Sequence, residues 1–97
     1  MNDNMLHILA GMFARSNMGM GMPPKEAITS MKQSRHSVSL DSAVVGFCEE
    51  FMEGSDEDDH YSLFMEEGKM WVDTLKEYGE EKARSIWPDI FKLYDEA

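Results

Sequence analysis

Apolar residues recur along most of this chain at intervals of three and four, which is the spacing of a helix that buries one face. Alternation with a period of two, which would indicate strands, does not extend over a useful length. The pattern therefore predicts an all-α fold, a small bundle of four to five helices. The 97 residues suit a single helical domain, residues 1–97, because two cores could hardly be filled from so short a chain.

The N-terminal half predicts three helices. The first covers about residues 4–15 and has a polar capping residue at one of positions 2–4. A Met/Gly/Pro linker at residues 18–23 ends it, and a second helix, led by proline, follows at about residues 24–33. The third helix covers about residues 40–52, where the apolar stripe continues for three turns.

The C-terminal half predicts a helix that starts near Asp56 and ends at Gly79, and a last helix that follows this glycine. Pro88 interrupts the last helix, so we expect a kink or two short helices that meet near Trp87. The stripe of this last segment comprises Ala83, Ile86, Trp87, Ile90, Phe91 and Tyr94. The residues predicted for the core are Phe47, Phe51, Phe64, Trp71, Leu75, Trp87 and Ile90.

Charge divides the chain into two unequal halves. Residues 1–48 hold three acids and four bases, a net charge of +1, whereas residues 49–97 hold sixteen acids and five bases, a net charge of −11. The acidic second half should repel nucleic acid and anionic membranes and attract basic proteins. We expect the basic residues of the first half, Lys25, Lys32, Arg35 and His36, to lie near the acidic half of the same or a neighbouring chain.

An acidic run without an intervening base is the candidate partner-binding surface. On paired helices its carboxylates would form a negative ridge that could occupy the phosphate-binding groove of a nucleic-acid-binding protein. The alternative is a solvated acidic surface that only keeps a small bundle soluble. The run comprises Glu49, Glu50, Glu53, Asp56, Glu57, Asp58, Asp59, Glu66 and Glu67.

The leading hypothesis is a non-enzymatic protein-binding module that inhibits or regulates a basic, nucleic-acid-handling protein through a DNA-mimic-like surface. In size and charge the chain is similar to small acidic inhibitors encoded by phages and mobile elements. We expect no direct contact with nucleic acid, because binding to phosphate needs several well-placed cations.

The runner-up is an assembly factor or chaperone that holds an apolar partner segment with the Met-rich N-terminal half. The same half predicts a homodimer, since its apolar surface looks too large for one small bundle to cover. The residues expected at the self-association surface are Met5, Ile8, Leu9, Met12, Phe13, Met18, Met20 and Met22.

Metal and nucleophile patterns are weak in this sequence. Residues 56–67 fit part of a calcium-loop template, but Tyr61 occupies the position that needs glycine. The three methionines of the linker, together with His7, could present soft ligands to Cu(I), although methionine is also a flexible gap filler. Cys48 lies on an apolar stripe, where a thiol is inert. We therefore expect no metal, no cofactor and no enzymatic activity.

The compartment follows from two further features. Cys48 is the only cysteine, which favours a reducing cytoplasm. The short apolar stretch at residues 5–14 has the length of a signal-peptide core. It follows Asp3, where a secretory signal would carry positive charge, so we expect that it is not a signal peptide. No window approaches the roughly 20 apolar residues that a membrane-spanning helix needs, so we expect a soluble protein.

Overall fold

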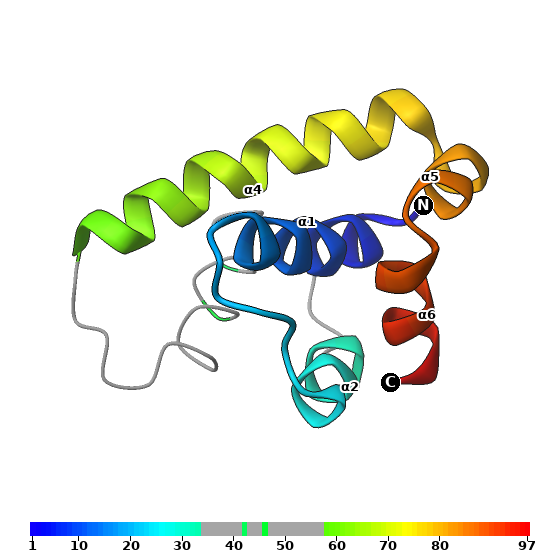
Figure 1. The fold of residues 1–97 in the computed structure, drawn as a ribbon, viewed down its shortest axis with the longest axis horizontal. Coiled ribbons are helices and arrows are strands. Elements are labelled where there is room, and N and C mark those ends of the chain that lie inside the picture. Colours follow the sequence, from blue (N-terminus) through cyan, green and yellow to red (C-terminus); the bar gives the residue numbers. More distant parts are fainter. Residues whose placement is uncertain (34–41, 43–45, 47–57) are drawn as a thin grey trace.

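A computed structural model describes residues 1–33, 42, 46 and 58–97 of the chain. Within these residues the structure is helical and contains no strand, which confirms the predicted all-α fold (Figure 1). The helices are α1 (Asp3–Asn17), α2 (Lys25–Gln33), α4 (Asp58–Tyr78), α5 (Glu80–Ile86) and α6 (Pro88–Glu96). The predicted third helix and the core positions Phe47 and Phe51 lie outside the described residues.

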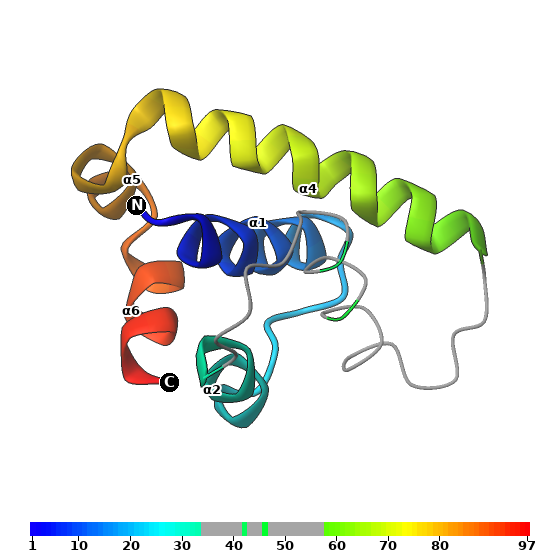
Figure 2. The same cartoon turned by 180° about the vertical axis from the view of Figure 1, so that it is seen from behind.

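Helix α1 is the centre of the described bundle. It lies antiparallel to α4 on one side and packs against α2 and α6 on the other, as opposite views of the molecule show (Figures 1 and 2). The largest fully buried side chains come from four of the helices and meet around α1. They are Ile8, Leu9, Met12, Ile28, Phe64, Leu75 and Phe91. Among the described helices, none is long and apolar enough to cross a membrane.

The start of α1 shows which of the candidate caps is used. Asn2 has an extended backbone, and its side-chain oxygen accepts a hydrogen bond of 2.8 Å from the backbone N–H of Met5. A helix leaves its first N–H groups without partners inside the helix, so this bond satisfies one of them. The helix begins one residue earlier and ends two residues later than its apolar pattern predicted.

The burial of α1 corrects the expected self-association surface. Met5, Ile8, Leu9, Met12 and Phe13 are all buried within the chain, between 0% and 7% exposed. Helices α4, α2 and α6 cover them, so α1 presents no apolar face to a second copy. In the linker that follows, Met18 and Met20 are half-buried against the core, and only Met22 is exposed.

The α4–α6 segment breaks where glycine and proline predicted it would. Gly79 has a φ of 82°, a conformation that favours glycine, and it separates α4 from α5. Trp87 leaves helical geometry with φ −123° and ψ 61°, and Pro88 opens α6 as its first residue. The alternative of two short helices is therefore the one that the chain adopts.

Three expectations for apolar positions in this segment were wrong. Ile86 is 46% exposed, because the break at Trp87 ends the stripe that it was expected to share with Ile90. Trp71 and Trp87 are half-buried and not in the core, since both lie at its edge. The predicted core positions Phe64, Leu75 and Ile90 are buried.

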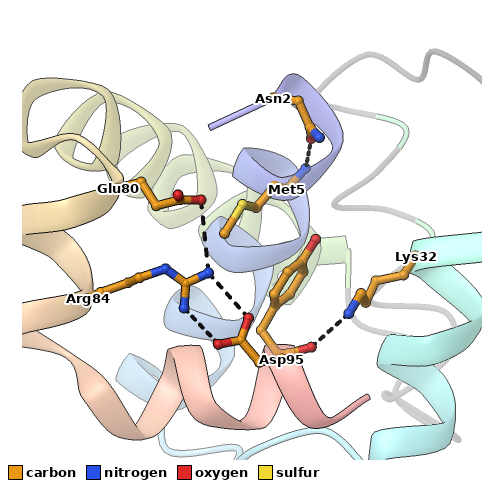
Figure 3. A network of polar contacts seen from close by, with 7 residues as sticks. Asn2, Met5, Lys32, Glu80, Arg84 and Asp95 are labelled. Carbon is orange, nitrogen blue, oxygen red and sulfur yellow. Dashed lines mark hydrogen bonds and ion pairs between the residues drawn. The ribbon is translucent and has the colours of Figure 1, made fainter.

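Polar contacts join the C-terminal helices to each other and to α2 (Figure 3). The guanidinium of Arg84 makes two hydrogen bonds to the carboxylate of Asp95, at 2.7 and 3.2 Å, and lies 3.9 Å from Glu80. The Nζ of Lys32 donates to the carbonyl of Tyr94 at 2.9 Å, and Lys25 pairs with Glu96 at 3.1 Å. Two residues of the basic set thus lie beside the acidic half of the same chain, as expected.

Candidate functional site

The predicted acidic ridge is only partly within the described residues. Glu66 is exposed and Glu67 is half-buried, and both belong to α4. Asp58 and Asp59 belong to the first turn of this helix, but their side chains lie outside the described residues. The remaining five carboxylates, Glu49, Glu50, Glu53, Asp56 and Glu57, also lie outside them.

An exposed methionine lies among carboxylates on α4. Met70 is 48% exposed, and residues three, four and seven positions from it in a helix share its side of the surface. These positions hold four acids, of which three are exposed. They are Glu66, Glu67, Asp73 and Glu77, which together with Met70 and Leu63 we call the outward flank of α4.

Leu63 extends the outward flank toward the start of the helix. It is 51% exposed and lies two turns before Met70, so the two apolar side chains share one line along α4 with Glu66 and Glu67 between them. Lys69 and Lys76, also one heptad apart, follow a neighbouring line on the helix, three or four positions from Glu66 and Asp73. The sequence carries no signal for this surface, because apolar spacing indicates the buried stripe of a helix and assigns no role to exposed apolar residues such as Leu63 and Met70.

An aromatic cluster borders the outward flank. The rings of Phe13 and Trp71 stack with centroids 4.3 Å apart and planes 17° apart. Trp87 meets both rings edge-on, at 5.2 and 5.6 Å, and contacts Tyr78 in the same way at 5.5 Å. The cluster therefore joins α1, α4 and the α5–α6 junction, three places that are far apart in the sequence.

A groove of about 300 Å³ opens beside these rings. Its lining residues come from α1, α4 and the α5–α6 junction: Phe13, Ser16, Asn17, Trp71, Trp87 and Ile90. The amide of Asn17 donates a hydrogen bond of 3.0 Å to the carboxylate of Glu67. This contact places one carboxylate of the outward flank at the edge of the groove.

Within the described residues, the titratable groups with shifted pKa values lie outside the outward flank and the groove. The hydrogen bond from Arg84 lowers the pKa of Asp95 and raises that of the guanidinium, and burial raises the pKa of Tyr94. Burial also lowers the pKa of His7 on α1. Arg84 and Asp95 form the polar contacts between α5 and α6, and these shifts follow from that packing and from burial.

Metal ligands do not gather in the part of the chain that the structure describes. There, no three His, Cys, Asp or Glu side chains are placed to hold one ion. The calcium-loop template falls partly outside the described residues, and so do Cys48 and His36. His60 belongs to α4, but its side chain is not among those that the structure describes. Comparison of the chain with models of known protein families, with curated proteins and with solved structures found no match.

Proposed function

We propose that this chain is a non-enzymatic, acidic protein-binding module whose partner is a basic, nucleic-acid-handling protein. In this proposal the module inhibits or regulates its partner by covering the surface that binds phosphate. The observation that carries the proposal is the set of four carboxylates around the exposed Met70 on α4. Carboxylates that face solvent together on one helix attract a surface built to receive phosphate charges.

The distribution of bases supports the same partner. Lys25, Lys32 and Arg84 contact carboxylates or carbonyl oxygens near the end of the chain. These cations therefore offset negative charge around α6. Lys69 and Lys76 border the outward flank of α4, and its four acids outnumber these two bases. With a net charge of −10, the molecule should bind a basic protein quickly, and more weakly as salt is added.

The competing function is that of a holder for apolar segments through the Met-rich linker. Such binding depends on buried apolar area, which salt does not screen. Salt dependence therefore separates the two functions.

The test is co-precipitation with the full chain as bait from the organism that encodes it, at low and at raised salt. We expect basic nucleic-acid-binding proteins to be retained at low salt and released as salt rises, and added DNA or RNA to compete with the bait. Retention that is insensitive to both salt and nucleic acid would contradict the proposal and favour the holder.

A pair of variants with equal net charge tests whether the flank itself matters. The first replaces Glu66, Asp73 and Glu77 by their amides. Its matched control replaces Glu26, Glu81 and Asp89, which are exposed on α2, α5 and α6. We expect the first variant to lose much more partner binding than the control. Equal losses would mean that overall charge, and not the flank, attracts the partner.

A further inference from the structure

We propose that the outward flank of α4 and the aromatic groove beside it form one docking surface for a basic, amphipathic segment of the partner protein. Lysine and arginine side chains of that segment would meet the carboxylates, and an apolar side chain would enter the groove. This inference rests on the proposed function and deepens it, because it adds an apolar contact to a charge-based interaction.

The fold leaves several apolar side chains of α4 uncovered beside the groove. Leu63 and Met70 are about half exposed on one line of α4, and Tyr78 is exposed two turns beyond Met70. Beside them, Trp71 and Trp87 are half-buried at the groove. Methionine and aromatic residues are enriched where proteins bind other proteins, since they supply large contact areas.

The size of the groove indicates what enters it. Pockets for small molecules have volumes of about 300 to 1,000 Å³. At about 300 Å³, this groove is at the lower limit of that range. It suits one aliphatic or aromatic side chain supplied by a larger partner, and the aromatic rings around it offer such a side chain an apolar surface.

The charge around the groove selects the occupant. Glu67 lies at its edge through the bond to Asn17. Glu66 is the neighbouring residue, and Asp73 and Glu77 follow six and ten positions further along α4. A second copy of this chain would bring the same carboxylates to the interface, and like charges that face each other oppose association. Nucleic acid and anionic lipid are repelled for the same reason. A segment that combines bases with apolar side chains is complementary to both features.

The two tryptophans make the groove directly observable. Trp71 and Trp87 are the only tryptophans of the chain, and both line the groove, so intrinsic fluorescence reports on this place. We would titrate the full chain with a synthetic amphipathic peptide of lysine and leucine. The controls are polylysine, which has charge alone, and a peptide in which serine replaces lysine. We expect a saturable shift of emission with the lysine–leucine peptide and weaker binding by both controls.

A pair of methionine variants then locates the contact. Met70→Ser removes the apolar side chain at the centre of the flank, and Met22→Ser removes one of similar exposure, 40% against 48%, from the linker. We expect Met70→Ser to weaken peptide binding about tenfold, the size of a moderate hot spot, and Met22→Ser to leave it unchanged. Because both side chains are exposed, both variants should fold, and circular dichroism checks this.

The remaining outcomes separate this inference from the proposed function. If polylysine binds as well as the amphipathic peptide and the tryptophan emission does not shift, the proposed docking surface is contradicted, whereas the proposed acidic binding module is still supported. If neither cationic ligand binds, both are wrong. If sedimentation shows a dimer that Met70→Ser dissociates, the occupant is a second copy and the inference is overturned.

Discussion

Helices α1 and α4 lie side by side, and they use apolar residues in opposite ways. Of the 15 residues in α1, nine are buried, and they surround its axis. Helix α4 is longer, with 21 residues, yet beyond Tyr61 its buried positions are Phe64, Gly68, Val72 and Leu75, spaced three and four apart. Both helices have an apolar stripe in sequence, but only α4 has a charged surface beside it.

The difference follows from where each helix lies. Described helices pack on α1 from both sides, so even residues off its main stripe are covered. Helix α4 packs on α1 with one face and carries exposed acids, Leu63 and Met70 on another. The apolar residues of α1 therefore stabilise the fold, and those on the outward flank of α4 are available to a partner.

The largest predicted change in stability comes from a comparison of one residue in α1 with one residue in α4. Leu9 is fully buried on α1, so Leu9→Ala should lower the free energy of unfolding by about 2 to 5 kcal/mol. Met70→Ala on the exposed flank should change it by no more than about 0.5 kcal/mol. Urea denaturation measures both free energies of unfolding. If Leu9→Ala does not fold, Ile8→Val replaces it, with an expected loss of about 0.5 to 1.5 kcal/mol. Equal effects at Leu9 and Met70 would abolish the distinction.

A smaller effect is expected where the two helices meet at their edge. Trp71 stacks on Phe13 but is only half-buried, so Trp71→Ala should cost about 1 to 3 kcal/mol, less than the 3 to 5 kcal/mol of a fully buried ring. The same denaturation experiment measures it, with Trp71→Phe as a control that keeps a stacked ring. A loss as large as that of a core residue would place Trp71 in the core and close the proposed groove.

A still smaller loss of stability is expected from removal of the N-cap of α1. Asn2→Ala removes the hydrogen bond to the N–H of Met5 and should destabilise the protein by about 1 kcal/mol. Asn2→Ser, which keeps a capping oxygen, should recover most of this loss. Thermal unfolding followed by circular dichroism at 222 nm, a helix signal, measures both. If Asn2→Ser is no better than Asn2→Ala, the cap does not stabilise this helix.

The smallest predicted effect concerns pH and His7. Burial is the main cause that lowers its pKa from 6.5; Lys76 adds to it and Asp3 opposes it. The folded chain therefore binds this proton less readily than the unfolded chain does. Stability should fall as pH drops from about 6.5 and become constant below the pKa of the folded state. His7→Gln should flatten this part of the stability curve, and an unchanged curve would contradict the assignment.

The sequence predicted the described helices well because their signals are local. Gly79 and Pro88 end or begin helices through their own backbone preferences, and Asn2 caps through a bond to a residue three positions away. Such features need no knowledge of the rest of the fold. The first apolar stripe likewise predicted α1 to within two residues at either end.

The candidate site could not be predicted in the same way, because it depends on distant contacts. Phe13 stacks on Trp71, 58 positions away in the sequence, and Asn17 bonds to Glu67 across 50 positions. Periodicity gives the apolar side of a helix, but it does not tell how many neighbours cover that side. For this reason α1 was expected at a self-association surface, and Ile86 was expected on a buried stripe.

The backbone of Trp87 also decides which side chains of α6 reach the core. With φ −123° and ψ 61°, this residue turns α6 back so that Ile90 and Phe91 are buried against the core. If α5 and α6 joined into one straight helix, these side chains would project away from their own core. Only the core of another molecule could then receive them, which is how a domain-swapped dimer forms. Straightening of this junction would therefore favour the exchange of α6 between molecules.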